Sequence, residues 1–158
     1  MVVRKGTFED LDRILEIYSF AREFMRETGN PNQWKDSEPR AELIMSDLER
    51  GDMYVLCEAG VIHAVWAFIV GEDSTYGHID GAWLSDEPYG TFHRVASDGT
   101  VHDVLTTAIE NCGMSHLRID THKDNKVMQH VIEKNGFTRC GIIYLPDGDP
   151  RIAYEKDA

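Results

Sequence analysis

The sequence predicts an α/β or α+β domain in which a sheet is layered between helices. Short runs rich in β-branched and aromatic residues alternate with amphipathic segments of helical period along the whole chain. The clearest pattern lies between residues 91 and 137, where an extended run, a turn and a helix are followed by a second set in the same order. With 158 residues and no repeat, low-complexity segment or linker, the chain is expected to form one domain, 1–158.

The first half of the chain is predicted to hold a strand, two helices and a hairpin. Thr7 is expected to cap the first helix, with Asp10 three residues on, and Ser37 to cap the second. The expected elements are a strand at 2–4, helices at 7–28 and 37–51, and hairpin strands at 53–58 and 61–70.

The second half is predicted to begin with a surface excursion, 72–90, whose five acidic residues, glycines and proline disfavour regular structure. Strands are then expected at 91–96 and 117–121, helices at 100–111 and 125–135, and a closing hairpin at 137–144 and 151–155. The turns between these strands and helices free backbone N–H groups that are suited to an anion or a carbonyl oxygen.

Composition and charge limit the classes of partner that we expect. Sixteen Lys and Arg stand against 28 Asp and Glu, a net charge of −12 with no basic stripe. This balance disfavours nucleic acid and anionic membranes and favours cationic amines. The three cysteines are far apart and form no CxxC, and the longest apolar run, 64–70, is too short to cross a bilayer. We therefore expect a soluble cytoplasmic protein.

Three segments resemble the GNAT superfamily, the acyl-CoA-dependent N-acetyltransferases. LRIDTHKDNKVMQHVIEKNGFTRCGIIY (117–144) is similar to the family's fifth strand, the helix that follows an Asn, and the Asn-Gly-Phe before the sixth strand. FHRVASDG (92–99) looks like its fourth strand, and TFEDLDRILEIY (7–18) like its first strand-to-helix segment. The resemblance implies a mixed, mostly antiparallel sheet of six to seven strands with about four helices, splayed between strands four and five.

The resemblance also implies that acetyl-CoA binds in this splay as a cosubstrate. The backbone of Val95 would pair with the pantetheine arm, and Asn125 would contact the arm from the other wall. The residues implied to bind the cofactor are Val95, Ala96, Ser97, Gly99, Thr100, Val101, Asn125 and Met128. Met128 has a core position as its alternative role.

Two features depart from the family pattern. Where the family has a glycine-rich pyrophosphate cradle, this chain reads ASDGTVHDV. Gly99 is the one glycine in that segment, and Asp103 places a negative charge nearby. Many members carry a Tyr four residues before the glycine of Gly-Phe to protonate the leaving thiolate, and this chain has Ile132 there. The resemblance therefore leaves the proton donor unassigned.

His93 is the best candidate for a catalytic base. An imidazole titrates near neutral pH, and strand alternation places His93 on the same face as Val95, just before the implied acyl site. Its position also matches a strand-four His of arylalkylamine-type members. The alternative is a structural His bonded to a carboxylate or carbonyl.

Trp34, Tyr76 and Trp83 lie on segments expected to line an acceptor pocket, either as substrate contacts or as loop anchors. The pairs His78 with Asp80 and His122 with Asp124 have no third ligand nearby, so no metal is expected, and Asp124 is expected to cap the following helix.

These observations predict an enzyme that moves an acetyl group from acetyl-CoA to a primary amine of a small molecule or protein, by direct attack in a ternary complex. The alternative is a non-catalytic protein of the same fold that binds an acyl-CoA or a partner protein. The oligomeric state stays open, with a homodimer among the alternatives.

Overall fold

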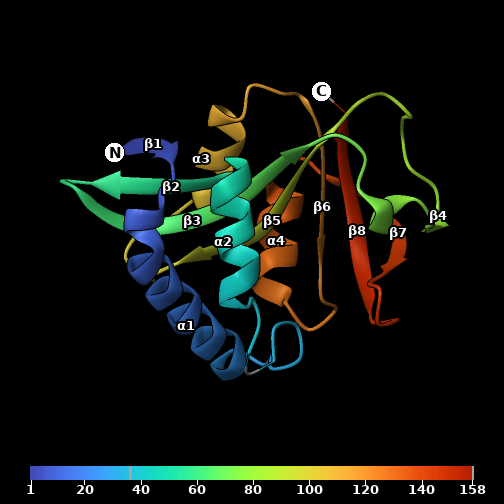
Figure 1. Cartoon of the computed structure of the whole chain (residues 1–158). Coiled ribbons are helices and arrows are strands. Elements are labelled where there is room, and N and C mark those ends of the chain that lie inside the picture. The colour runs from blue at the N-terminus through green and yellow to red at the C-terminus, as the bar shows by residue number, and fades with distance from the viewer. Residues whose placement is uncertain (36, 158) are drawn as a thin grey trace.

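A computed structural model describes residues 1–35 and 37–157 of the chain. Its strands form one sheet in the order β1-β2-β3-β5-β6-β8-β7-β4 (Figure 1). The strands are β1 (Val2–Lys5), β2 (Met53–Glu58), β3 (Val61–Val70), β4 (Asp80–Gly81), β5 (Gly90–Ser97), β6 (His116–Thr121), β7 (Thr138–Tyr144) and β8 (Pro150–Asp157). All neighbours are antiparallel except β5 and β6, which are parallel.

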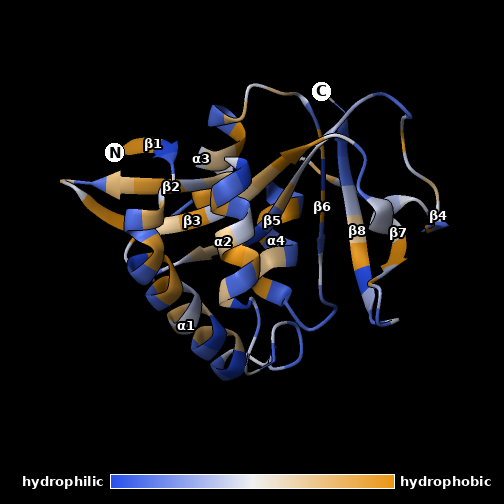
Figure 2. Cartoon of the chain, viewed as in Figure 1, coloured by the Kyte–Doolittle hydropathy of each residue, from blue (hydrophilic) through white to orange (hydrophobic). Residues whose placement is uncertain are grey.

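Helices cover both faces of the sheet. They are α1 (Leu11–Glu27), α2 (Ala41–Arg50), α3 (Val104–Asn111) and α4 (Lys126–Lys134), with 3-10 turns η1 (Phe8–Asp10) and η2 (Ser74–Tyr76). α1 and α2 share one apolar cluster with the sheet, whereas α3 and α4 share another. Adjacent residues of β2 divide between them: Val55 belongs to the first cluster and Leu56 to the second. In Figure 2, apolar residues run along the central strands, and the helices carry both apolar and polar residues.

Most elements lie where the sequence places them. The mixed, mostly antiparallel sheet with four helices is confirmed, and the strand count rises to eight because the excursion contributes the two-residue β4. Thr7 lies at the N-cap position of η1, the 3-10 turn that leads into α1, and its backbone N–H donates to Asp10 Oδ2 at 2.8 Å. The expected capping pair is therefore present, although α1 itself begins at Leu11. Apolar spacing and turn residues were sufficient here because both act within a few positions of the chain.

Two helix starts were predicted too early. α3 begins at Val104 rather than Thr100 because Asp98 holds the preceding residues in a turn, accepting from the backbone N–H of Thr100 at 3.0 Å. α2 begins at Ala41, with Arg40 and not Ser37 at its N-cap position. The backbone N–H of Glu38 donates to the Trp34 carbonyl, which closes a turn ahead of the helix.

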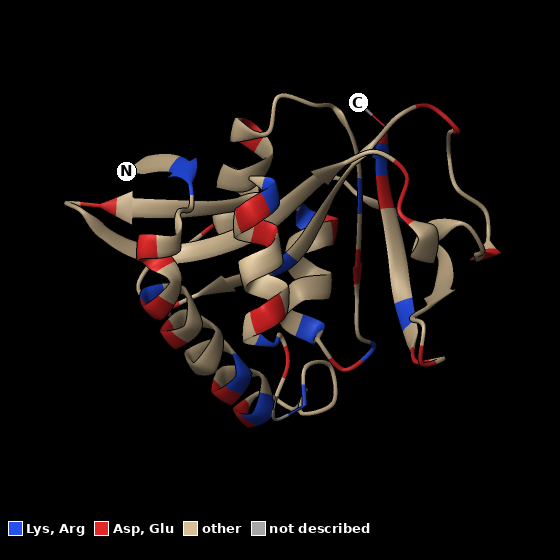
Figure 3. Cartoon of the chain, viewed as in Figure 1, with Lys and Arg blue, Asp and Glu red and all other residues tan. Residues whose placement is uncertain are grey.

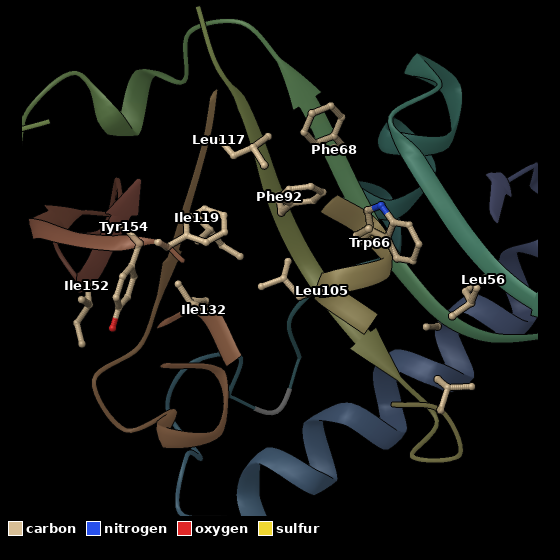
Figure 4. Close-up of a cluster of buried hydrophobic side chains, with 14 residues drawn as sticks. Leu56, Trp66, Phe68, Phe92, Leu105, Leu117, Ile119, Ile132, Ile152 and Tyr154 are labelled. Atoms are coloured by element: carbon tan, nitrogen blue, oxygen red, sulfur yellow. The ribbon is translucent and has the colours of Figure 1, made fainter. Parts of the chain in front are cut away.

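The sheet opens between its two parallel strands. β5 and β6 are in register only at Gly90 with Leu117 and Thr91 with Arg118, and they diverge beyond these pairs (Figure 1). The sequence-based interpretation placed the parting after Val95, so the structure moves it toward Phe92. Figure 4 shows Phe92 and Ile119, one from each strand, among the buried side chains at this point.

The start of the parting is closely packed. A Cβ added at Gly90 would lie 2.3 Å from Phe68 Cζ, and Phe68 is itself buried against Phe92. We predict that Gly90→Ala lowers the free energy of unfolding by about 1–3 kcal/mol, because the ring must move out of a filled core. Urea denaturation measures the change. Gly77→Ala is the matched control, since its added Cβ meets only the Ser74 carbonyl at 3.3 Å; equal losses in both variants would contradict the assignment.

The excursion between β3 and β5 covers the part of the sheet that α1 and α2 leave uncovered. Tyr76 and Tyr89 pack on Ile143 and Ala153 in a third apolar cluster. This arrangement brings residues 73–76 to the edge of the opening between β5 and β6, a placement that no local sequence pattern indicates.

Candidate active site

A bulge in β5 lies beside the opening. β3 pairs Val65 with Ala96 and Ala67 with His93, so Arg94 and Val95 together oppose one residue. Arg94 has a left-handed backbone, φ 54°. Val95 has no register partner on either neighbouring strand of the described chain. Its main-chain groups are therefore placed to bind a ligand in the opening.

Two side chains hold the bulge in position. Tyr18 of α1 donates its hydroxyl to the Arg94 carbonyl at 2.8 Å. Asp47 of α2 is fully buried and accepts from both Nε and Nη2 of Arg94 at 2.9 Å. The structure shows that this pair fixes a strained backbone, which is an ordinary feature of functional sites.

Two cavities meet at the opening. The His93 cavity, about 490 Å³, is lined by residues that include Trp34, His93, Asp120 and Arg151. The Gly99 cavity, about 370 Å³, runs between α1, α3, α4 and the end of β5. Both are lined by Met25, Val95, Asn125 and Met128. A ligand that extends along the Gly99 cavity would therefore present its end to the His93 cavity.

The structure gathers seven of the eight residues that the resemblance implied for the cofactor. Val95, Ala96, Ser97, Gly99, Val101, Asn125 and Met128 line the Gly99 cavity. Thr100 does not line it, since its hydroxyl binds Asp98 and contacts His63 Nδ1 at 3.0 Å. The cavity wall is completed by Phe20 and Phe24 of α1, both about half exposed, which sequence reasoning assigned to no site.

The phosphate end of the Gly99 cavity differs from a glycine-rich cradle. Gly99 adopts φ +84°, and an added Cβ would lie 3.0 Å from Phe20, so a side chain is disfavoured there. Asp103 precedes α3 at the cavity rim, but Lys134 of α4 pairs with it at 3.2 Å and offsets its charge. Among the lining residues none is Lys or Arg. The free N–H groups at the start of α3 and His102 are the groups that fit an anion.

Asn125 joins the two walls of the opening. Its Oδ1 accepts from the backbone N–H of Met128 at 3.0 Å and caps α4. Its Nδ2 donates to Gln33 Oε1 at 2.9 Å, across the chain. The prediction that Asp124 caps this helix was wrong, because Asn125 takes that position and the Asp124 side chain lies 3.6 Å from His122.

We predict that Asn125→Ala weakens acetyl-CoA binding by about tenfold, since it removes both the cap and the bond to Gln33. Calorimetric titration measures the dissociation constant. Asn125→Asp is the matched control, because its carboxylate retains the cap and loses only the donor to Gln33. An unaltered constant in Asn125→Ala would remove the residue from the cofactor site.

His93 lies in its cavity paired with a carboxylate. Its Nε2 is 2.9 Å from Asp73 Oδ2, and one fifth of the imidazole is exposed. A carboxylate accepts only, so Nε2 carries the proton and the neutral ring keeps the Nδ1 lone pair. The hydrogen bond from His93 lowers the pKa of Asp73 from its ordinary value. The ionised carboxylate therefore stabilises the fold above pH ~4, and this contribution is lost as the pH falls below that range.

Of the three aromatic candidates for substrate contact, one lines the His93 cavity and two do not. Trp34 lines the His93 cavity and packs edge-on against Tyr18, with ring centroids 5.6 Å apart. Tyr76 is buried, lines neither cavity, and donates its hydroxyl to Asp120 at 2.6 Å. Trp83 also lines neither and stacks on the Arg118 guanidinium at 3.9 Å. The structure thus places Tyr76 and Trp83 as anchors of the excursion, the alternative role that the sequence allowed.

Ile132, at the usual Tyr position, is fully buried among the side chains of α3, β6 and β8 (Figure 4). Its side chain carries no acidic group, so it cannot donate a proton to a thiolate. Among residues 1–35 and 37–157, no group of three or more His, Cys, Asp or Glu could hold a metal ion.

Sequence reasoning missed Asp73, Gln33 and Arg151. Asp73 lies 20 residues before its partner His93, and Gln33 lies 92 before Asn125 and 118 before Arg151. None of the three belongs to a motif of fixed spacing. The acidic excursion and the polar loop after α1 were the only available signals, and neither identifies a residue.

A sheet parted between two parallel strands, with cavities meeting at a bulge, is the architecture of the acyl-CoA-dependent transferases that the sequence resembles. A GNAT-family acetyltransferase from Streptococcus agalactiae is 32% identical, with a TM-score of 0.89, and the match covers 99% of this chain and 95% of that one. The chain therefore belongs to the GNAT family of acetyltransferases.

Two more distant structures share the fold. An acetyltransferase from Salmonella typhimurium, solved with its cofactor acetyl-CoA, is 15% identical with a TM-score of 0.62, over 99% of this chain and 92% of that one. A ribosomal-protein-alanine N-acetyltransferase from Brucella melitensis is 15% identical with a TM-score of 0.63, over the whole of both chains. Models of protein families and curated proteins gave no significant match. In the described ranges, no helix has the length and apolar character to span a bilayer.

Proposed function

We propose that the protein transfers an acetyl group from acetyl-CoA to a primary amine, by direct attack in a ternary complex. The observation that carries this proposal is the junction of the two cavities at Val95, Asn125 and Met128. The pantetheine arm would occupy the Gly99 cavity, and the amine would occupy the His93 cavity. The thioester would then lie at the bulge, where Val95 of β5 has no register partner among the described residues.

The chemistry follows from the groups at the junction. His93 accepts a proton from the substrate ammonium, and the neutral amine attacks the thioester carbonyl carbon. The backbone N–H of Val95 stabilises the charge on the carbonyl oxygen. The C–N bond forms, the C–S bond breaks, and the attacking nitrogen loses its second proton to water while the departing thiolate takes a proton from water, so the products are the amide and coenzyme A. Ile132 supplies no proton, so the Tyr that many members carry at this position has no counterpart here.

A second candidate is a protein that binds an acyl-CoA without turnover. One observation favours it: Ile132, at the usual position of the acid, is part of the core. A missing acid is expected in a protein that binds an acyl-CoA without transferring its acyl group.

One experiment distinguishes the two. Acetyl-CoA is titrated calorimetrically, and release of free thiol is then followed against a panel of primary amines. Thiol release that requires the amine supports the transferase. Binding without release supports the second candidate, and no binding contradicts both. Reactions without amine are needed as blanks, because Cys112 and Cys140 are partly exposed free thiols that react with the same reagents.

A further inference from the structure

Arg151 is a buried cation on the wall of the His93 cavity. It lies on β8 with 5% of its surface exposed. Nη1 donates to the Pro150 carbonyl at 2.9 Å and Nη2 to the Gln33 carbonyl at 3.1 Å. No carboxylate of residues 1–35 or 37–157 lies within 4.0 Å of it. A guanidinium carries five donors, so several remain for a ligand.

Arg118 provides an internal comparison. It is buried to the same extent, 5% exposed, but Nε donates to Glu155 at 2.8 Å and the guanidinium lies between the rings of Trp83 and Tyr89. The chain therefore provides a carboxylate and two aromatic faces for one buried arginine and neither for the other. Burial of an unpaired charge is costly, which makes the lack of a counterion at Arg151 significant in a chain of net charge −12.

Several carboxylates of the described residues line the same cavity as Arg151, including Asp120, Asp147 and Asp149, but none forms a direct ion pair with it. Asp149, two residues away, lies 3.9 Å from Lys35. His122 Nδ1 accepts a hydrogen bond from the backbone N–H of Asp124. Burial is the main cause that lowers the pKa of His122, and the charge of Arg151 is the second. The ring is therefore neutral near pH 7. Figure 3 shows acidic residues on helices, loops and strands, but no ion pair of the described residues includes Arg151.

We propose that Arg151 binds a carboxylate of the acceptor, so that the amine acetylated in the His93 cavity belongs to an amino acid or a similar small amino carboxylate. This inference rests on the proposed function. The planar guanidinium matches a carboxylate in bidentate geometry, whereas a polyamine would be repelled. His93 and Asp120 line the same cavity and suit the ammonium group. A volume of about 490 Å³ fits a small molecule of this class.

The test uses L-alanine, L-leucine, L-phenylalanine and L-glutamate, each beside its α-carboxamide, with spermidine as an amine that lacks a carboxylate. Thiol release should favour the acids over the amides by at least about tenfold in kcat/KM. Arg151→Gln should raise KM for the acids by a similar factor and leave the amides unchanged. Arg151→Lys keeps the positive charge but lacks the planar guanidinium, so its KM for the acids should lie between those of the wild type and Arg151→Gln. Arg139→Gln, at an exposed position of β7, is the matched control.

Acetyl-CoA binding and Tm show whether each variant is folded. Equal use of acids and amides, equal loss of both in Arg151→Gln, or turnover of spermidine alone would overturn the inference. If no amine is turned over, the proposed function fails, and the inference is then decided without acetyl-CoA. A rise in Tm with the acids but not the amides, present in the wild type and absent from Arg151→Gln, supports it, and no such rise contradicts it.

Discussion

Replacing His93 with Ala should lower kcat for amine acetylation by about 100- to 10,000-fold, the range expected when a general base is removed. The same variant should lose the rise of rate between about pH 5 and pH 8, in which imidazoles titrate. Binding of acetyl-CoA should be unchanged, because His93 lines only the other cavity. Steady-state rates at saturating amine, measured across this range, give both quantities.

Two variants sharpen this result. His130→Ala removes an exposed imidazole from α4 and should leave the rate and the profile as they are. Asp73→Asn keeps the His93 side chain but removes the carboxylate that fixes its proton on Nε2, so it should lower kcat and shift the profile. If His93→Ala retained the rate within about twofold and kept the profile, His93 would be structural and another group would be the base.

Asp47→Ala should lower the free energy of unfolding by about 3–5 kcal/mol, because it leaves the Arg94 guanidinium without its buried partner. Arg50 also loses a contact, at 2.8 Å. The bulge should relax once Arg94 is no longer held at φ 54°, and acetyl-CoA affinity should fall with it. Urea denaturation and calorimetric titration measure the two effects.

Asp52→Ala is the control for this prediction. Asp52 pairs with Arg50 at 3.0 Å near the surface, so its loss should cost less than about 1 kcal/mol. A double variant, Asp47→Ala with Arg94→Ala, should recover part of the loss, since no buried charge is then left unpaired. Equal costs for Asp47→Ala and Asp52→Ala would show that the pair does not hold the bulge.

The candidate site was only partly predictable. His93, Asn125 and the residues around Gly99 could be named as candidates because the family resemblance points to them and local patterns place them in a strand, after it or at a helix start. The partner of Asp103 was not predictable, since the sequence shows the charge of Asp103 but not that Lys134, 31 residues away, lies 3.2 Å from it. Tyr76 and Trp83 were placed with the substrate because nothing local shows whether a loop aromatic turns inward or outward.

The sequence alone determined the order of strands and helices, the hairpin turns, the capping pair at Thr7 and the family resemblance. Each of these depends on residues within a few positions of one another. The tertiary structure decided where β5 and β6 separate, that Asp73 pairs with His93, and that Gln33 links Asn125 to Arg151. Those contacts join segments up to 118 residues apart. They form only when the excursion and the loop after α1 fold over the open edge of β6, which no local pattern encodes.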